Sequence, residues 1–453
     1  MDNEKYKKRI IDSLVDKYIS IFGAVCIEGP KLCGKSWTSS YHCNSQFFVG
    51  DPGGGFQNRR LAELSPYTVL AGEAPRLIDE WQEVPLLWDA VRHEVDVRGL
   101  RGQFILTGSS TPQRKGVLHS GAGRYGFIRM NTMTLYETGD SSGEISLSDI
   151  CNGIFTTVLT GEVNIYDLAK YVIRGGWPNN LDLPDDQIHE LPQNYITAIL
   201  HNDFYKLENA EFISENNEET RYNADKMFLL LESLARNEST AASKNKLRND
   251  ISGKNGADNK DSADTDVEDK KLHAATINLY LDELDNMFIT DNQPPFHPNI
   301  RSSIRVKQME KRHFCDPSLA CALLNVKTPD WLVNNLNTFG FMFEALVEHD
   351  LKVYAQSFGG KLYHYQDYNT KNNEIDAVIE LDDGSWCAFE IKLGHNEVED
   401  AAKQLVAIRD SFLNSKDDKN KAPSVLCVIC GLSNAAYLRP DGVYVVPITA
   451  LKN

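Results

Sequence analysis

The stretch Gly29-Pro-Lys-Leu-Cys-Gly34-Lys35-Ser36 matches the complete phosphate-binding (Walker A) pattern. Its glycines leave room for main-chain N–H groups to converge on a β-phosphate, where a side chain would obstruct the turn. The apolar residues 20–27 precede the loop and helical sequence follows it, which is the strand–loop–helix setting that the pattern requires. The helix that starts near Lys35 also presents the positive end of its dipole to this loop. The sequence therefore predicts a nucleotide site in an α/β domain.

The loop predicts ATP and Mg²⁺ as the two cofactors. Lys35 would reach the β- and γ-phosphates, and the Ser36 hydroxyl would ligate Mg²⁺. The residues expected to contact the nucleotide are Gly29, Pro30, Lys31, Leu32, Cys33, Gly34, Lys35, Ser36 and Trp37.

Two acids follow a second apolar segment, residues 76–79. Asp79, at its end, would lie beside the loop and hold Mg²⁺ through water. Glu80, the next residue, would polarise the attacking water as a general base. At the end of the following strand, Thr107 and Ser109 are candidates for sensing the γ-phosphate or orienting that water. For each of these two, an ordinary polar turn is the alternative.

The chain divides into four segments by pattern. Residues 1–150 alternate apolar strands with helices, which is typical of a parallel α/β sheet. Residues 151–235 are mostly helical, and 236–335 form a further helical module. The polar, acidic residues 252–272 interrupt that module and cannot bury enough apolar surface to offset their ordering entropy, so they are expected to be disordered. Residues 336–453 return to α/β character.

Individual elements follow from hydrophobic periodicity. Strands are expected at residues 20–27, 46–49, 76–79, 103–107, 361–365, 374–381, 386–391 and 424–430. Helices are expected at residues 86–95, 165–174, 191–207, 224–236, 243–250, 275–284, 343–354 and 398–412.

Composition narrows the class of protein. A chain of 453 residues is too long for one compact core, and its 42% hydrophobic and 25% charged content is ordinary for soluble proteins. No apolar run approaches the roughly 20 residues of a membrane span, so we expect a cytoplasmic protein without membrane contact. The net charge of −17 argues against passive coating of DNA. The nine cysteines predict reduced, buried thiols, and the Cys427/Cys430 pair lacks the partners of a zinc site.

A series of short motifs occurs in a specific order along almost the whole chain. It resembles the bacterial and archaeal ATPases that pair an AAA-type domain with a C-terminal domain of unknown function. The motifs are the phosphate-binding loop, Leu77–Glu80, Phe104–Ser110, Gly123-Arg124, Met133–Glu137, Arg174–Pro178, Ser233–Asn237 and Lys311–Ala320.

The resemblance implies an AAA+-like P-loop ATPase that forms homo-oligomers and completes its site with an arginine. Such an arginine stabilises the charge of the transferring phosphoryl group. Arg124 is the first choice, from the same or a neighbouring subunit, with Arg129 and Arg174 as weaker candidates. A surface or structural role is the alternative for each of these arginines.

The helices at residues 243–250 and 275–284 resemble a winged helix. Its second helix could enter a DNA groove or serve as a packing module. Because that helix carries Asp282, Glu283 and Asp285, which would repel phosphate, we favour packing or protein binding.

The tail resembles the PD-(D/E)XK nuclease fold. Asp376, Glu390 and Lys392 are separated by even steps along strand-like segments and could share one face, with Glu344 on the preceding helix and Gln404 on the following one. The two acids would ligate Mg²⁺ and the lysine would orient water. The alternative is a buried charge network, since many of the ATPases that the chain resembles carry degenerate forms of this module and a fold does not guarantee its chemistry.

Three functions remain open from the sequence. The first is an Mg²⁺-dependent ATPase that couples its nucleotide cycle to a nuclease-like or binding tail. The second is an ATP-gated, metal-dependent DNA endonuclease, and the third is a nucleotide-dependent regulatory binding protein with little turnover. A DNA or protein partner is implied but not identified.

Overall fold

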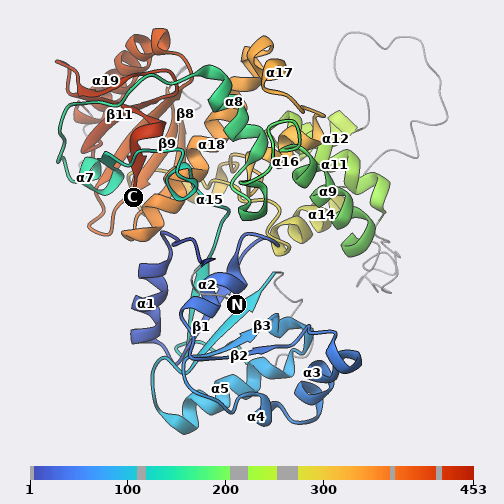
Figure 1. Cartoon of the computed structure of the whole chain (residues 1–453). Coiled ribbons are helices and arrows are strands. Elements are labelled where there is room, and N and C mark those ends of the chain that lie inside the picture. Colours follow the sequence, from blue (N-terminus) through green and yellow to red (C-terminus); the bar gives the residue numbers. More distant parts are fainter. Residues whose placement is uncertain (1–4, 110–118, 205–222, 252–273, 368–372, 415–420) are drawn as a thin grey trace. The chain divides into compact units, whose positions relative to one another are not determined.

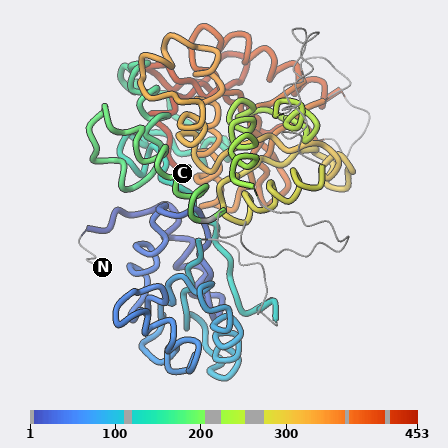
Figure 2. The backbone as a smooth tube through the Cα atoms, turned by 90° about the vertical axis from the view of Figure 1, so that its right-hand side faces the viewer, coloured from blue at the N-terminus to red at the C-terminus, as the bar shows by residue number. Residues whose placement is uncertain are grey.

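The computed structural model describes residues 5–109, 119–204, 223–251, 274–367, 373–414 and 421–453 (Figure 1, Figure 2). The chain forms two compact units, Met1–Met133 with Asp285–Ile289 and Thr134–Leu284 with Thr290–Asn453. The division into four segments at residues 150, 235 and 335 stays a prediction. The insertion expected to be disordered, residues 252–272, lies outside the described residues.

The first unit is built on one parallel sheet (Figure 1). Its strands are β1 (Ala24–Glu28), β2 (Ser45–Phe48), β3 (Arg76–Asp79), β4 (Phe104–Gly108) and β5 (Tyr125–Arg129), in the order β2-β3-β4-β1-β5. All four pairings are parallel, which confirms the predicted sheet. Two features were not predicted: β5 itself, and the position of β4 between the strand of the loop and the strand of Asp79.

Helices cover both faces of this sheet. Alternate strand residues point to opposite sides, and since they are apolar on both sides, both faces must be buried. On one face, Val25, Leu77 and Ile105 pack with α1 (Asp12–Ile21). On the other, Cys26, Ile78 and Leu106 form a core with side chains of the other helices. These are α3 (Gly53–Leu64), α4 (Pro66–Val69) and α5 (Leu86–Arg98), while α2 (Lys35–Tyr41) follows the loop.

The predicted first strand was too long at its start. Residues 20 and 21 are the last turn of α1, since Val15, Tyr18 and Ile19 on that helix pack against the sheet and keep the segment helical. The strand begins only at Ala24.

The second unit contains a seven-stranded mixed sheet, in the order β7-β12-β13-β11-β10-β9-β8. β10, β11 and β13 run parallel, and β8, β9 and β12 pair with their neighbours in antiparallel fashion. The strands are β7 (Val158–Leu159), β8 (Lys361–Asp367), β9 (Asn373–Glu380), β10 (Trp386–Lys392), β11 (Val425–Cys430), β12 (Ala435–Leu438) and β13 (Val443–Pro447). A separate pair joins β6 (Ile145–Ser146) to β14 (Leu451–Lys452).

Helices make up the rest of the second unit. Its described helices are α6 (Leu135–Thr138), α7 (Leu147–Cys151), α8 (Ile165–Arg174), α9 (Glu190–Ala198), α11 (Ala224–Arg236), α12 (Lys244–Ile251), α14 (Ala274–Asn286), α15 (Ile304–Lys307), α16 (Pro317–Leu323), α17 (Pro329–Asn334), α18 (Leu336–Ser357) and α19 (Val398–Leu413). The predicted helix 191–207 was too long: α9 ends at Ala198 and a π-helical segment, Ile199–Phe204, follows. None of the helices that the structure describes has the length and apolar character of a membrane span.

The module expected to resemble a winged helix consists of α11, α12 and α14, followed by a few antiparallel bridges. Thr240 pairs with Arg312, and Gln293 pairs with Lys311. On α14, Asp282 is exposed, whereas Glu283 is buried and cannot meet a phosphate directly. The winged-helix assignment stays a proposal.

All nine cysteines are free thiols, and every one except Cys43 is buried. Cys427 and Cys430 lie within the buried strand β11, as the apolar sequence around them predicted.

Candidate functional site

The phosphate-binding loop joins the end of β1 to the start of α2, as predicted. Gly34 caps the helix with a positive φ of 104°, a conformation that favours glycine. Gly29 is required for a different reason, because a Cβ atom there would lie 2.0 Å from the Met130 carbonyl oxygen. Both glycines are therefore required by the backbone: Gly34 by its own conformation and Gly29 by the approach of the Met130 carbonyl.

Lys35 lies inside the loop and is only 5% exposed. Its Nζ donates hydrogen bonds to the carbonyls of Gly29 at 2.9 Å and Pro30 at 2.8 Å. These bonds hold the ammonium group within the curve of the loop. Trp37 is exposed on the first turn of α2, and Leu32 is exposed at the loop with a positive φ of 64°.

Asp79 and the loop come together at the carboxyl ends of the strands. Thr107 Oγ1 donates to Asp79 Oδ1 at 2.6 Å, from the neighbouring strand β4. Burial raises the pKa of Asp79, while the hydroxyls of Thr107 and Ser36 and the charge of Lys35 act in the opposite direction. The buried carboxylate thus lies near the serine and the lysine of the loop.

Glu80 adopts a left-handed backbone conformation, φ 55° and ψ 49°, which is strained for a residue with a side chain. Its main-chain N–H donates to Thr107 Oγ1 at 3.1 Å. Its carboxylate accepts a hydrogen bond of 3.0 Å from Ser109 Oγ and another from the Gln82 amide. The strained turn and these two donors fix the orientation of the Glu80 side chain. The contact with Gln82 was not predicted.

The residues at this edge also fit a magnesium ion. A hydroxyl and a carboxylate are oxygen ligands of the kind that Mg²⁺ takes. Ser36 and Asp79 would supply this pair, since the serine hydroxyl lies near enough to act on the pKa of the Asp79 carboxyl.

The three candidate arginines lie in different places. Arg124 precedes β5 and pairs with Asp96 at 2.9 Å, at the Ala24 end of β1. The loop follows the Glu28 end, so one strand length separates Arg124 from it within a subunit. Arg129 pairs across the sheet with Glu28 and lies at the same edge as the loop. Arg174, in the second unit, is buried in an ion pair of 2.6 Å with Asp140.

Arg9 belongs to this site although sequence reasoning missed it. The side chain is 7% exposed and donates to the Cys33 carbonyl at 2.8 Å and the Asn131 carbonyl at 2.9 Å. It precedes α1 and carries no local motif, so no pattern signalled its contact with the loop.

The second constellation is also brought together, on β9 and β10 of the second unit. Lys392 Nζ lies 2.8 Å from Glu390 Oε2 and 3.3 Å from Asp376 Oδ2. The main-chain N–H of Ile391 donates to the same Asp376 oxygen at 2.8 Å. Burial and the nearby Asp376 raise the pKa of Glu390 well above its usual value. Gln404, on α19, donates to the Glu374 carbonyl at 2.7 Å.

A second lysine, which was not predicted as a site residue, extends this constellation. Lys311 is 2% exposed, and its Nζ pairs with Glu344 and with Glu348, the latter at 2.8 Å. It also donates to the Asp376 carbonyl at 3.4 Å. Burial and the charge of Asp376 raise the pKa of Glu344 to about 8, although Lys311 opposes the shift. Glu344 thus lies in a salt-bridge contact with Lys311 while burial favours its protonated form.

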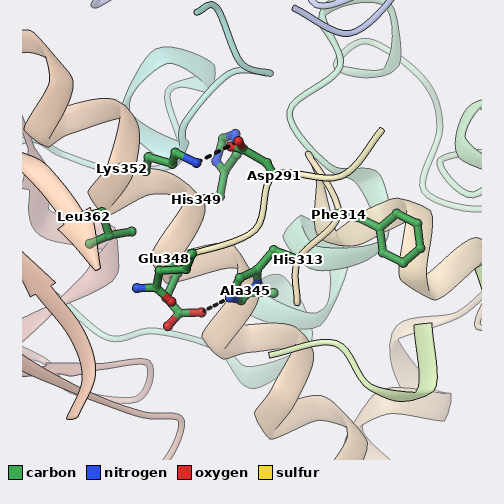
Figure 3. A pocket seen from close by; sticks show the side chains of 9 residues that line it. Asp291, His313, Phe314, Ala345, Glu348, His349, Lys352 and Leu362 are labelled. Carbon is green, nitrogen blue, oxygen red and sulfur yellow. Dashed lines mark ion pairs between the residues drawn. The ribbon is translucent and has the colours of Figure 1, made fainter. Parts of the chain in front are cut away.

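The network continues to His313, whose ring lies between two carboxylates. Its Nε2 is 3.0 Å from Glu348 Oε2, and its Nδ1 is 3.0 Å from Glu238 Oε1. Burial acts to lower the pKa of His313, but these two acids raise it to about 9. Figure 3 shows His313 and Glu348 facing each other, with a second ion pair between Asp291 and Lys352.

These residues border a cavity of about 20 Å³, which has room for about one water molecule (Figure 3). The cavity is lined by Asp291, Gln293, His313, Phe314, Ala345, Glu348, His349, Lys352 and Leu362. It is too small for a nucleotide or a nucleic-acid strand.

Lysines pair with the acids of the second unit in this arrangement. Lys392 bridges Asp376 and Glu390, and Lys311 engages Glu344. Across the described ranges, no group of three or more histidine, cysteine, aspartate or glutamate side chains is placed to hold a metal ion. The two-acid metal site stays a prediction, with a charge network as its alternative.

Comparison with known families identifies the first segment. Residues 22–139 match the family model of an AAA domain. These residues are similar to an AAA domain, and the segment is called the AAA domain below. The loop, Asp79, Glu80 and Thr107 all lie within the matched residues, whereas Arg9 lies outside them.

Most of the rest of the chain matches families without a known function. Residues 165–330 and 339–451 match models of two domains of unknown function, DUF8612 and DUF4143. A Walker-type ATPase of Pyrococcus abyssi shares 11% identity over 71% of this chain and 97% of its own, with a TM-score of 0.36, too low to compare the two structures. No curated protein matches the sequence significantly.

Proposed function

We propose that the AAA domain binds ATP with Mg²⁺ at the loop and hydrolyses it. The observation that carries this proposal is the position of Thr107, whose hydroxyl joins the Asp79 carboxylate and the Glu80 main chain beside Lys35 and Ser36. This arrangement supports the proposed roles of Asp79 as a metal ligand and of Glu80 as a general base, next to the proposed phosphate-binding groups.

Each residue then has a part in the reaction. Lys35 and the loop N–H groups bind the phosphate oxygens, and Ser36 and Asp79 hold Mg²⁺, which when bound neutralises charge on the phosphates. Glu80 accepts a proton from the attacking water as the water oxygen bonds to the γ-phosphorus. The bond from that phosphorus to the β,γ-bridging oxygen breaks, and ADP and phosphate form. Ser109 and Gln82 keep the Glu80 carboxylate in place.

Phosphate release by the purified protein tests this proposal. Lys35→Ala should lose ATP binding, whereas Glu80→Gln should bind ATP and lose about 10²- to 10⁴-fold in kcat. Glu83→Gln is the matched control, because Glu83 is a half-exposed acid three residues away that pairs only with Arg59 in the described contacts. If the wild type binds no ATP, the proposal fails. ATP binding without turnover would instead support the regulatory binding protein.

We also propose that turnover in the AAA domain acts on the second unit. The support is that both units are parts of one chain. The partner, whether DNA or protein, would be found by measuring the ATPase rate in the presence of each. A rate that no DNA, RNA or protein changes would count against this coupling.

An ATP-gated endonuclease is the second candidate, and the convergence of Asp376, Glu390 and Lys392 favours it. The lysine bridges and the absence of a metal-holding group among the described residues argue against it. Plasmid DNA incubated with Mg²⁺ or Mn²⁺, with and without ATP, decides the matter. Cleavage that Asp376→Asn abolishes, and the exposed-site control Asp400→Asn does not, would establish the nuclease.

A further inference from the structure

The nucleotide-binding loop needs something to hold its main chain in one orientation. Gly34 has no side chain to restrict it, and it adopts a positive φ. The N–H groups of such a loop bind phosphate only if their peptide planes already face it. A group that binds the opposite side of one of these peptides would therefore fix the site.

Arg9 binds the loop in this way. Its Nη1 donates to the Cys33 carbonyl, 2.8 Å away. Because the peptide between Cys33 and Gly34 is planar and trans, its C=O and N–H point in opposite directions. A bond that holds the carbonyl on the Arg9 side therefore turns the Gly34 N–H away from Arg9. We propose that Arg9 is a positioning residue that orients this peptide for phosphate binding; the inference rests on the proposed ATP site.

The second bond of Arg9 connects the loop to the sheet. Its Nη2 donates to the Asn131 carbonyl at 2.9 Å, just beyond the end of β5. The neighbouring Met130 carbonyl is the atom that leaves no room for a Cβ on Gly29. The same chain segment thus contacts the loop directly at Gly29 and, through Arg9, at Cys33.

The N-terminal segment also holds the other end of the helix that follows the loop. Asp12 lies 3.1 Å from His42 Nε2, immediately after α2, and accepts a 2.9 Å hydrogen bond from the Arg9 main-chain N–H. Tyr6 bonds to Asp12 at 2.6 Å and lies 3.0 Å from the Thr38 hydroxyl on α2. Arg9 therefore projects from a segment anchored at several points and can act as a rigid support.

A matched pair of variants tests this role in the full chain. Arg76 is also a buried arginine of the first unit, and its Nε donates to the Val69 carbonyl at 2.6 Å. It starts β3, at the edge of the sheet opposite the loop. Arg9→Met and Arg76→Met remove comparable buried groups, and only the first removes a contact to the loop.

ATP and ADP affinity, kcat, KM and Tm would be measured for both variants. We expect Arg9→Met to weaken ATP and ADP binding about tenfold or more and to lower kcat by about 100-fold, because misplaced donors cost both binding and rate. Arg76→Met should lower Tm and keep the affinity within about threefold, since distant sites act independently. Arg9→Lys, which keeps one charged donor, should fall between the wild type and Arg9→Met.

The outcomes separate the two proposals. If the wild type turns over ATP and the two methionine variants lose affinity and kcat equally, Arg9 is only structural and the inference is overturned. The same conclusion follows if Arg9→Met binds and hydrolyses ATP like the wild type. Should Arg9→Met fail to fold, a folded Arg9→Lys variant with unchanged affinity and kcat overturns the inference, and one with weakened affinity supports it. If the wild type binds no ATP, the proposed function itself fails and this inference fails with it.

Discussion

Thr107 Oγ1 donates a hydrogen bond of 2.6 Å to Asp79 Oδ1, which joins the ends of two neighbouring strands. The same oxygen accepts the main-chain N–H of Glu80 at 3.1 Å. One hydroxyl thus determines the positions of the proposed magnesium ligand and of the residue that carries the proposed base. Thr107, at the end of its strand, therefore contacts both the residue predicted to hold Mg²⁺ and the residue predicted to act as the base.

Replacing Thr107 by valine should damage both functions, because valine has the same shape but no hydroxyl. The buried Asp79 carboxylate and the Glu80 N–H would each lose a partner, at about 1–3 kcal/mol each in stability. We expect kcat to fall by about tenfold or more, since the base is then less well placed. Thr107→Ser should restore most of the rate. A valine variant with wild-type kcat would show that the hydroxyl has no such role.

The position of Arg124 leads to a prediction about how subunits assemble. Within a subunit it lies at the edge of the sheet opposite the loop, so it can act on phosphate only in a neighbouring copy. If it does, Arg124→Ala should lower kcat by about 10³-fold or more. A mixture with Lys35→Ala should regain activity, because one interface then combines an intact loop with an intact arginine. An inactive mixture of co-assembled variants, or full activity of Arg124→Ala alone, would exclude this role.

Lys311 should be important for the stability of the second unit. It is almost fully buried between Glu344 and Glu348, and its loss leaves carboxylates without their cation. Lys311→Met is expected to lower the free energy of unfolding by about 3–5 kcal/mol. Lys403→Met is the control, because its pairs with Glu399 and Asp400 are exposed and such pairs contribute about 0–1 kcal/mol. Equal Tm values for the two variants would contradict the network as described.

The same network predicts that the second unit loses stability at alkaline pH. The pKa of His313 is raised from an ordinary 6.5 to about 9, so its contribution is complete below pH 6.5 and is lost as the pH rises through about 9. The pKa of Glu344 is raised to about 8 by burial, so the folded unit also loses stability as the pH rises toward 8 and this acid must ionise.

Thermal unfolding between pH 6 and pH 10 measures this dependence. The transition of the second unit should fall in temperature mainly between pH 6.5 and pH 9. In Glu344→Gln the decline below about pH 8 should become shallower, since glutamine has no proton to lose. A Tm that is constant or rises over this range would contradict the raised pKa values of His313 and Glu344.

Elements with strong local signals were predicted closely. The bounds of α8, α11 and β3 agree with the expected ranges, and side-chain caps explain the first two. Asn164 caps α8 and Asn223 caps α11, so each helix starts where its own sequence places a cap. β5 was missed because its sequence, Tyr-Gly-Phe-Ile-Arg, contains a glycine, and pairing with β1 makes it a strand.

The position of the phosphate-binding loop was determined by the sequence alone, because an apolar strand before it and a helix after it were enough to place it. Gly34 and Lys35 act through backbone conformation and atoms of the loop itself, whereas Gly29 is required by the approach of the Met130 carbonyl, which only the tertiary structure brings there. The contacts of Arg9 with Cys33 and of Lys311 with Glu344 and Glu348 could be decided only by the tertiary structure. They join residues far apart in the chain, and their geometry depends on how sheets and helices pack. Local periodicity carries no information about such pairs, because it records which face of an element is buried and not what that face meets.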